Sequence, residues 1–318
     1  MAWLPWHVLS QRAVVWSGFL LDKIEPMCKR FACFCLGYPM DLLQADPGVL
    51  LTFGAVIVAA GVVGGLLAGM LGVGGGIIIV PVLYQVLGMV DVAEAVRMKV
   101  AVATSLGTII ATSALSIRSH YARGAVDLDL LKSWGVPIFL GVVAGTAYGG
   151  VADGRILTAV FAVVALLIAL QMAFTSQGGK RRDGFPNNAA KAFSGLVVGA
   201  VSALMGIGGG TLSVPILVRY GFDIRHAVGT ASAIGFIIAI PATLGYMISG
   251  YGVEMLPPFS LGYFNVAAAL VLVPLTMTFA PVGARIAHSI PRRALQLCFA
   301  LFLGLTASSM FYDLLKSA

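Results

Sequence analysis

Several apolar runs in this chain reach or exceed the roughly 20 residues that cross a bilayer as one helix, and such runs occupy most of its 318 residues. Charged residues make up 10% of the chain, against roughly 25% in an average soluble domain. The runs lie near residues 50–71, 75–90, 98–117, 132–152, 155–175, 190–206, 209–220, 227–248, 262–284 and 293–314. The lipid bilayer is therefore the expected solvent, and the expected fold class is an all-α polytopic membrane protein.

The net charge of +7 is spread over short loops between the apolar runs, which argues against a nucleic-acid partner. Lys and Arg in short loops mark the cytoplasmic side of a membrane protein. The clearest example is the linker 176–189, which carries Lys180, Arg181 and Arg182. We therefore expect a multi-pass protein of the bacterial inner membrane with this linker in the cytoplasm. The same rule places further basic residues there: Arg118, Arg123, Lys132, Arg219, Arg225, Arg285, Arg292 and Arg293.

The N-terminal extension, residues 1–48, mixes tryptophans and basic residues with short apolar stretches. This mixture suits an interfacial helix better than a cleavable signal, which would need a charged start leading into an apolar core. The four cysteines lack the paired spacing and the histidines of a zinc site, so free thiols and no metal or cofactor are expected. The cysteines are Cys28, Cys33, Cys35 and Cys298.

An internal repeat organises the rest of the chain. Gly72–Leu83 (GVGGGIIIVPVL) and Gly206–Leu217 (GIGGGTLSVPIL) share seven of twelve residues, and each is followed by a helix that contains a threonine, Thr104 or Thr230. The glycine triplets and the prolines interrupt a helix. We therefore expect two transmembrane repeats, 49–175 and 190–318, each a glycine-interrupted helical hairpin followed by three transmembrane helices.

The charges predict that the two repeats are inverted. The loop 249–261 has no basic residue and is expected outside, while the central linker is inside, so equivalent points of the repeats are separated by an odd number of crossings. Arg97, Lys99 and Arg155 are then left outside, against the rule. These three residues keep a parallel-repeat topology open as an alternative.

The glycine turns are the candidate binding site. Non-helical backbone at membrane depth persists where protein buries it or where it lines a polar cavity. A helix that starts after each turn directs unpaired N–H groups and its positive dipole end at the break, and two such ends would bind an anion. The alternative is that glycines permit tight helix packing, which is the preferred interpretation of Gly61, Gly65 and Gly69.

Hydroxyl groups and cations near the turns complete the candidate site. Hydroxyls at helix starts can donate hydrogen bonds to an anion, although Ser and Thr also bond to their own helix. The cations could attract the anion or anchor the helices at headgroup level. The candidate substrate-binding residues are Gly74, Gly75, Gly76, Thr104, Ser105, Gly208, Gly209, Gly210, Thr230, Ser232, Arg97, Lys99, Arg225 and His226.

No Asp or Glu lies in the middle of an apolar run, where coupling to protons or sodium usually places a carboxylate. A monovalent anion that leaves a negative-inside cell gains roughly 2.3 kcal/mol per 100 mV, which favours efflux or facilitated passage. A membrane-embedded enzyme would need a nucleophile with a base or a cluster of metal ligands. All four histidines lie at segment ends, so the chain is not expected to be an enzyme.

Four segments carry a family resemblance from about residue 50 to the C-terminus: Ala103–Asp127, HAVGTASAIGFIIAIPATLGY, LPPFSLGYFNV and APVGARIAHSIPRRAL. In these segments and in its glycine turns, the chain resembles the TauE/SafE sulfite exporter family. This resemblance implies a transporter of a small anionic substrate such as sulfite, sulfoacetate or a related sulfonate, with the glycine turns and the threonine-containing helices as the cargo region. An anion channel, or an uptake permease for another small anion, is the alternative, and the residues specify no oligomeric state.

Where family members often have Gly-Thr-Ser, this chain has Ala103-Thr104-Ser105 in the first repeat and Gly229-Thr230-Ala231 in the second. His226 has Val100 at the equivalent position. The two halves of the expected site are therefore not identical.

Overall fold

The computed structural model describes residues 47–71, 75–174, 184–289 and 292–316. The chain divides into two compact units, Met1–Leu51 and Thr52–Ala318, and the second unit is the helix bundle. The expected interfacial helix in the N-terminal extension, like the three cysteines near the N-terminus, falls outside the described residues, apart from Pro47 and Gly48 at the start of α2.

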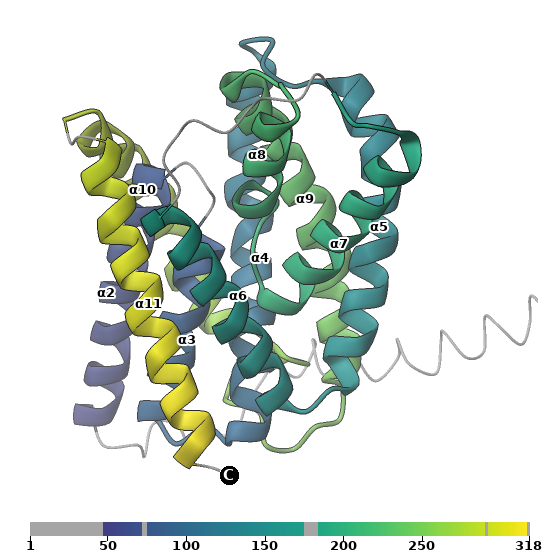
Figure 1. Cartoon of the computed structure of the whole chain (residues 1–318). Coiled ribbons are helices and arrows are strands. Elements are labelled where there is room, and N and C mark those ends of the chain that lie inside the picture. The colour runs from purple at the N-terminus through teal and green to yellow at the C-terminus, as the bar shows by residue number, and fades with distance from the viewer. Residues whose placement is uncertain (1–46, 72–74, 175–183, 290–291, 317–318) are drawn as a thin grey trace, which may run out of the picture. The chain divides into compact units, whose positions relative to one another are not determined.

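The described part of the chain is almost entirely helical (Figure 1). Seven of its helices are long and apolar enough to cross a membrane, which agrees with the expected all-α polytopic class. A hairpin of two strands, each of two residues, lies between α9 and α10. The elements are α2 (Pro47–Leu71), α3 (Gly76–Met89), α4 (Glu94–Tyr121), α5 (Leu128–Val151), α6 (Gly154–Phe174), α7 (Asn188–Met205), α8 (Gly210–Arg219), α9 (Ile224–Ser249), β1 (Ser260–Leu261), β2 (Phe264–Asn265), α10 (Val266–Ser289) and α11 (Arg292–Lys316).

The two short helices, α3 and α8, begin at the glycine triplets as the sequence predicts. They have 14 and 10 residues, whereas a helix needs about 20 residues to cross the roughly 30 Å hydrocarbon core. Each contains one proline, Pro81 or Pro215. Neither helix is therefore long enough to cross the membrane alone, and each begins with backbone N–H groups that have no acceptor within the helix.

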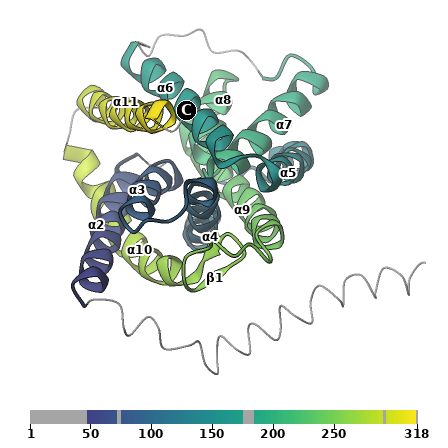
Figure 2. The ribbon, with the colours of Figure 1, turned by 90° about the horizontal axis from the view of Figure 1, so that it is seen from below.

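Helices α4 and α9 pack against each other at the centre of the second unit. Figure 2 shows them side by side, with α3 beside α4. Met98 of α4 and Ile234 and Ile238 of α9 are completely buried. This central pair determines where the glycine turns can lie.

Small residues join the outer helices to one another. A Cβ added to Gly199 of α7 would clash with the carbonyl oxygen of Ile138 in α5. On the opposite side, a Cβ on Gly61 or Gly65 of α2 would lie 2.8 to 2.9 Å from atoms of α10. The predicted role of Gly61 and Gly65 in tight helix packing is therefore confirmed.

One end of the helix bundle gathers the segments expected in the cytoplasm. The ring of Phe185, from the central linker, lies 4.3 Å from that of Tyr220 after α8 and 5.6 Å from that of Trp134 in α5, measured between centroids. The indole of Trp134 also donates a hydrogen bond to the carbonyl of Lys191 in α7, at 2.9 Å. The linker, the end of α8 and the start of α5 therefore lie together at one end of the bundle.

Packing between helices follows one pattern in both halves of the chain. Helix α3 packs on α4 as α8 packs on α9, and α5 packs on α9 as α10 packs on α4. Helix α5 packs on α7, and α10 packs on α2 through the glycines described above. The contacts of α4 with α9 and of α6 with α11 join equivalent helices. These pairs therefore exchange with one another when the halves are exchanged, whereas the contact of α4 with α6 has no counterpart of similar size between α9 and α11 in the described residues.

Candidate functional site

The two glycine turns meet inside the second unit. A Cβ added to Gly76 would lie 2.5 Å from the carbonyl oxygen of Gly206 and 3.0 Å from Cα of Ile207. Gly206 has a φ of +68°, a left-handed conformation that favours glycine. The hydroxyl of Ser105 donates a hydrogen bond to the same carbonyl of Gly206, at 2.8 Å. Residues about 130 positions apart are thus held in direct contact.

A cavity of about 200 Å³ lies next to this contact. Both turns and four helices contribute to its walls. Five of the predicted site residues line the cavity: Gly75, Gly208, Gly209, Gly210 and Ser232. The other lining residues are Ile79, Thr108, Ile109, Thr112, Ser113, Ser116, His120, Val228, Ala231, Gly235, Thr276 and Ala280.

Backbone amides are the first polar groups that the cavity offers. Gly75 and Gly209 are the N-caps of α3 and α8, and neither helix start has a hydrogen bond from a capping side chain. The first N–H groups of a helix have no acceptor within the helix, and its dipole makes this end positive. Two positive helix ends therefore border one cavity, which is an arrangement that attracts a negative charge.

Hydroxyl groups are the second kind of polar group in the cavity wall. The hydroxyls of Ser116 in α4 and Ser232 in α9 lie 2.9 Å apart and form a hydrogen bond across the cavity wall. Thr108 and Thr112 also line the cavity, and their hydroxyls donate to carbonyl oxygens of their own helix. Rotation of these hydroxyls would let them donate to a bound solute.

The charge of the cavity wall is close to neutral. His120, in the last turn of α4, is the one titratable residue among those that line the cavity, and no lining residue is acidic. The absence of a carboxylate from this set removes the repulsion that a negative solute would meet. The wall therefore combines positive helix ends and hydroxyls with no fixed negative charge.

None of the α4 residues that line this cavity was predicted from the sequence. Thr108, Thr112, Ser116 and His120 recur at every fourth position, so they lie along one side of the helix. This regular polar spacing within an apolar run was the available signal. The histidine that lines the cavity is His120, whereas the sequence singled out His226, which is exposed at the start of α9.

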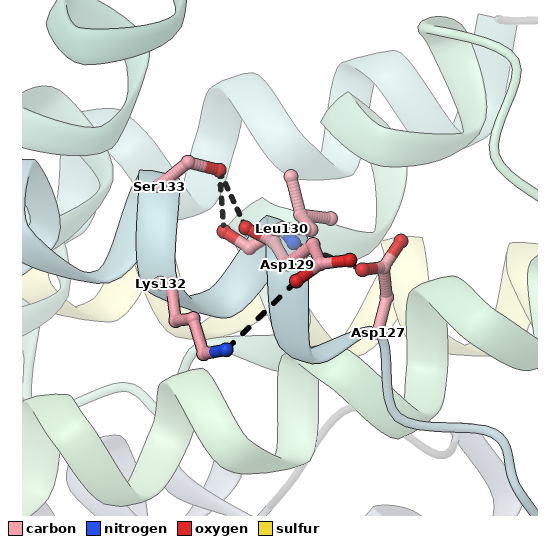
Figure 3. Close-up of polar contacts among 5 residues, drawn as sticks. All are labelled: Asp127, Asp129, Leu130, Lys132 and Ser133. Atoms are coloured by element: carbon pink, nitrogen blue, oxygen red, sulfur yellow. Dashed lines mark hydrogen bonds and ion pairs between the residues drawn. The ribbon is translucent and has the colours of Figure 1, made fainter.

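Thr104 and Thr230 do not line the cavity, and each hydroxyl instead accepts a hydrogen bond from the backbone of a loop. The hydroxyl of Thr104 accepts a hydrogen bond from the backbone N–H of Asn265, at 3.0 Å, and that of Thr230 accepts one from the backbone N–H of Asp127, at 2.9 Å. Asp127 caps α5 by accepting from the N–H of Leu130, at 2.9 Å (Figure 3). Each threonine thus fastens the loop that follows the central helix of the other half.

We expect Thr104→Val to lower the stability of the protein more than Thr278→Val does. Valine has a similar shape but cannot accept the hydrogen bond from Asn265, and a buried N–H without an acceptor costs about 1–3 kcal/mol. Thr278 is exposed and bonds only to carbonyls of its own helix. Thermal unfolding in detergent should place Thr104→Val several degrees below the control, and equal melting temperatures would contradict this role.

The predicted cationic residues also lie outside the cavity lining. Lys99 is 8% exposed and donates to the carbonyl of Gly150, at 3.1 Å, near the C-terminal end of α5. Its ammonium also lies 5.2 Å from the ring centroid of Tyr263, and burial raises the pKa of that phenol, which keeps it neutral. Lys99 therefore joins α4 to α5 and to the hairpin.

Arg97 and Arg225 have separate positions. The guanidinium of Arg97 donates to the carbonyl of Val92, at 3.0 Å, and lies over the ring of Tyr84. Arg225 is exposed in the first turn of α9. Among the remaining candidates, Gly76 lies in the contact between the turns, while Gly74 lies outside the described residues.

Comparison with known proteins gives one consistent result. A family model described as sulfite exporter TauE/SafE matches residues 57–310. A "Probable membrane transporter protein" of Haemophilus influenzae is 30% identical over 262 residues, which cover 82% of this chain and 99% of that protein. A protein of the same description from Bacillus subtilis, YunE, is 26% identical, with 81% and 97% of the two chains covered. No solved structure matches the chain significantly.

Proposed function

Because the chain belongs to the sulfite exporter TauE/SafE family, and is thus a multi-pass membrane transporter of the bacterial inner membrane, we propose that its cargo is a small sulfur-containing anion. Sulfite, sulfoacetate and related sulfonates are the candidates. We further propose that the cargo binds in the cavity between the glycine turns, where Gly75 and Gly208–Gly210 form the wall.

The observation that carries this proposal is the meeting of two helix starts at one cavity without an acidic side chain in its wall. A sulfonate or sulfite group has three oxygens that can accept from backbone N–H groups and from hydroxyls. Helix N-termini bind such tetrahedral anions without a full positive charge from the protein. A site of this kind can release its cargo again, because the attraction comes from partial charges.

We also propose that the two halves are inverted repeats. Several helix contacts exchange when the halves are exchanged, such as α3 on α4 with α8 on α9, and the hydrogen bonds of Thr104 and Thr230 are a matched pair between the halves. Inverted repeats place the substrate site at the repeat interface, near the middle of the membrane, and let one arrangement open to either side.

Flux into liposomes that contain the purified protein tests the cargo. Sulfite and sulfoacetate are expected to cross faster than in protein-free liposomes, with a rate that saturates as cargo concentration rises. A cargo at about 100 times its dissociation constant should also stabilise the folded protein by about 2.7 kcal/mol, which raises its melting temperature. Taurine, sulfate and thiosulfate complete the panel. Flux at the protein-free rate for every anion, with no thermal shift, would reject the proposal, and flux that never saturates would indicate a pore.

A further inference from the structure

The polar face of α4, made of Thr108, Thr112, Ser116 and His120, connects the glycine turns to one end of the bundle. All four residues line the cavity. Thr108 is completely buried beside the turns, whereas Thr112, Ser116 and His120 are partly exposed. The cavity therefore becomes more accessible toward the C-terminal end of α4, where His120 lies.

The equivalent face in the other half of the chain is closed. Thr104 and Thr230 make the same hydrogen bond in the two halves, and this pairing gives the register between α4 and α9. The positions equivalent to the polar face are then Ile234, Ile238, Ala242 and Tyr246. Each of these four residues is 0% exposed. Three of them are apolar, and Tyr246 donates its hydroxyl to the carbonyl of Ala203, at 3.3 Å.

Helices α10 and α5, which contribute to the two equivalent sides, differ in the same way. Asp127 and Asn265 have the same role at the starts of α5 and α10, which gives the register between these helices. Thr276 and Ala280 of α10 line the cavity. Their equivalents in α5, Ile138 and Val142, are 0% exposed. The side of the bundle where α4 and α10 line the cavity is therefore hollow and polar. The equivalent side, at α9 and α5, is packed and mainly apolar.

We propose that the polar face of α4 is the access path between the cytoplasm and the glycine turns, and that the matching face of α9 is the closed external gate. The cytoplasmic assignment comes from the exposed Arg118 and Arg123, which flank His120. This inference rests on the proposed function, because it assigns a path to the same cavity. The structure is then the cytoplasm-open state of the transporter.

The two faces also give the two ends of the path different chemistry. On the cytoplasmic side a solute passes hydroxyl groups that can replace part of its hydration shell. On the external side the path exists only after α9 moves away from the helices packed around Ile234 and Ile238, since these side chains have no polar atoms and are fully buried. The hydrogen bond of Tyr246 to Ala203 adds a link between α9 and α7 that opening must break.

Cysteine accessibility tests this assignment with a matched pair of variants. Ser116→Cys and Ala242→Cys are introduced separately into full-length protein whose four native cysteines, including the exposed Cys298, are replaced by serine. Vesicles of both orientations are treated with a charged, membrane-impermeant methanethiosulfonate, and modification is followed by mass. The positions are equivalent in the repeats and both changes are small, so the pair reports the difference between the faces.

Ser116→Cys is expected to react only from the cytoplasmic side and at least tenfold faster than Ala242→Cys reacts from either side. Equal rates at the two positions, or reaction of Ser116→Cys only from outside, would overturn the proposal. If Ser116→Cys does not fold, Thr112→Cys replaces it with the same expected outcome. No cargo is present in this experiment, so its result is independent of the flux and thermal-shift tests of the sulfur-anion proposal.

Discussion

Replacing Gly208 by valine is expected to abolish transport while the protein stays folded. A Cβ on Gly208 would lie 3.4 Å from Cγ2 of Ile109, an ordinary van der Waals contact, and Gly208 lines the cavity. The two further methyl groups of valine would occupy space next to the amides of the glycine turn. Because one methylene in a binding pocket changes binding by about 1–3 kcal/mol, we expect Gly208→Ala to lower flux at least about tenfold and Gly208→Val to lower it further.

Gly135→Ala is the control for this series. A Cβ on Gly135 of α5 would lie 3.5 Å from Cδ1 of Ile237, so the added methyl group meets similar packing, and Gly135 does not line the cavity. Flux of the best cargo into liposomes and the melting temperature are measured for all three variants. If Gly208→Val keeps the flux of the control, the glycine turn is not the binding site. If it melts well below the control, the substitution acts on folding instead.

Gly199→Leu is expected to cause the largest loss of stability among single substitutions in α7. The backbone of α5 lies directly against Gly199, and a Cβ there would clash with the carbonyl of Ile138 and lie 2.9 Å from the backbone N of Val142. Neither atom can move without separating the two helices. Overpacking of this kind typically costs about 1–3 kcal/mol, and more when the backbone must shift. We expect a fall of several degrees in the melting temperature.

The matched control is Gly304→Leu in α11. A Cβ added at Gly304 meets no atom within 4 Å, so the same substitution adds the same apolar surface without a clash. Thermal unfolding and size-exclusion profiles in detergent compare the two proteins. A melting temperature of Gly199→Leu equal to that of Gly304→Leu would show that α5 and α7 can separate at little cost.

Local chemistry made much of the fold predictable. Gly75–Gly76 with Pro81, and Gly209–Gly210 with Pro215, predicted two short helices, and α3 and α8 begin at these glycines. The fourfold spacing of Gly61 and Gly65 predicted close helix packing, and both residues lie against α10. These features depend on neighbours in sequence or on one face of one helix, so they can be inferred without knowing the partner helix.

The roles of individual hydroxyls could not be inferred in the same way. Ser105 bonds to a carbonyl 101 residues away and Thr230 to an amide 103 residues away. A threonine near the start of a helix has the same local sequence whether it faces a cavity or a loop. Which side of α4 meets the glycine turns depends on how α9 and α10 pack against it, and this is a property of the folded chain.

The three basic residues that disagreed with the charge rule have local partners. Lys99 bonds to the carbonyl of Gly150, Arg97 to the carbonyl of Val92, and Arg155 lies 3.7 Å from the carboxylate of Glu94. Each of these cations is therefore fixed in the fold by an acceptor close to it. Such partners are invisible to a count of Lys and Arg along the sequence.

The crossed hydrogen bonds of Thr104 and Thr230 have a consequence for biosynthesis. Thr104 is made long before Asn265, so its partner is still missing when the ribosome has finished helices α2 to α6. Helix α5 must likewise wait for α7, and α2 for α10, before their glycine faces are covered. The amino-terminal half therefore enters the membrane as an incomplete set of helices, and final assembly comes late, once the last helices have been inserted.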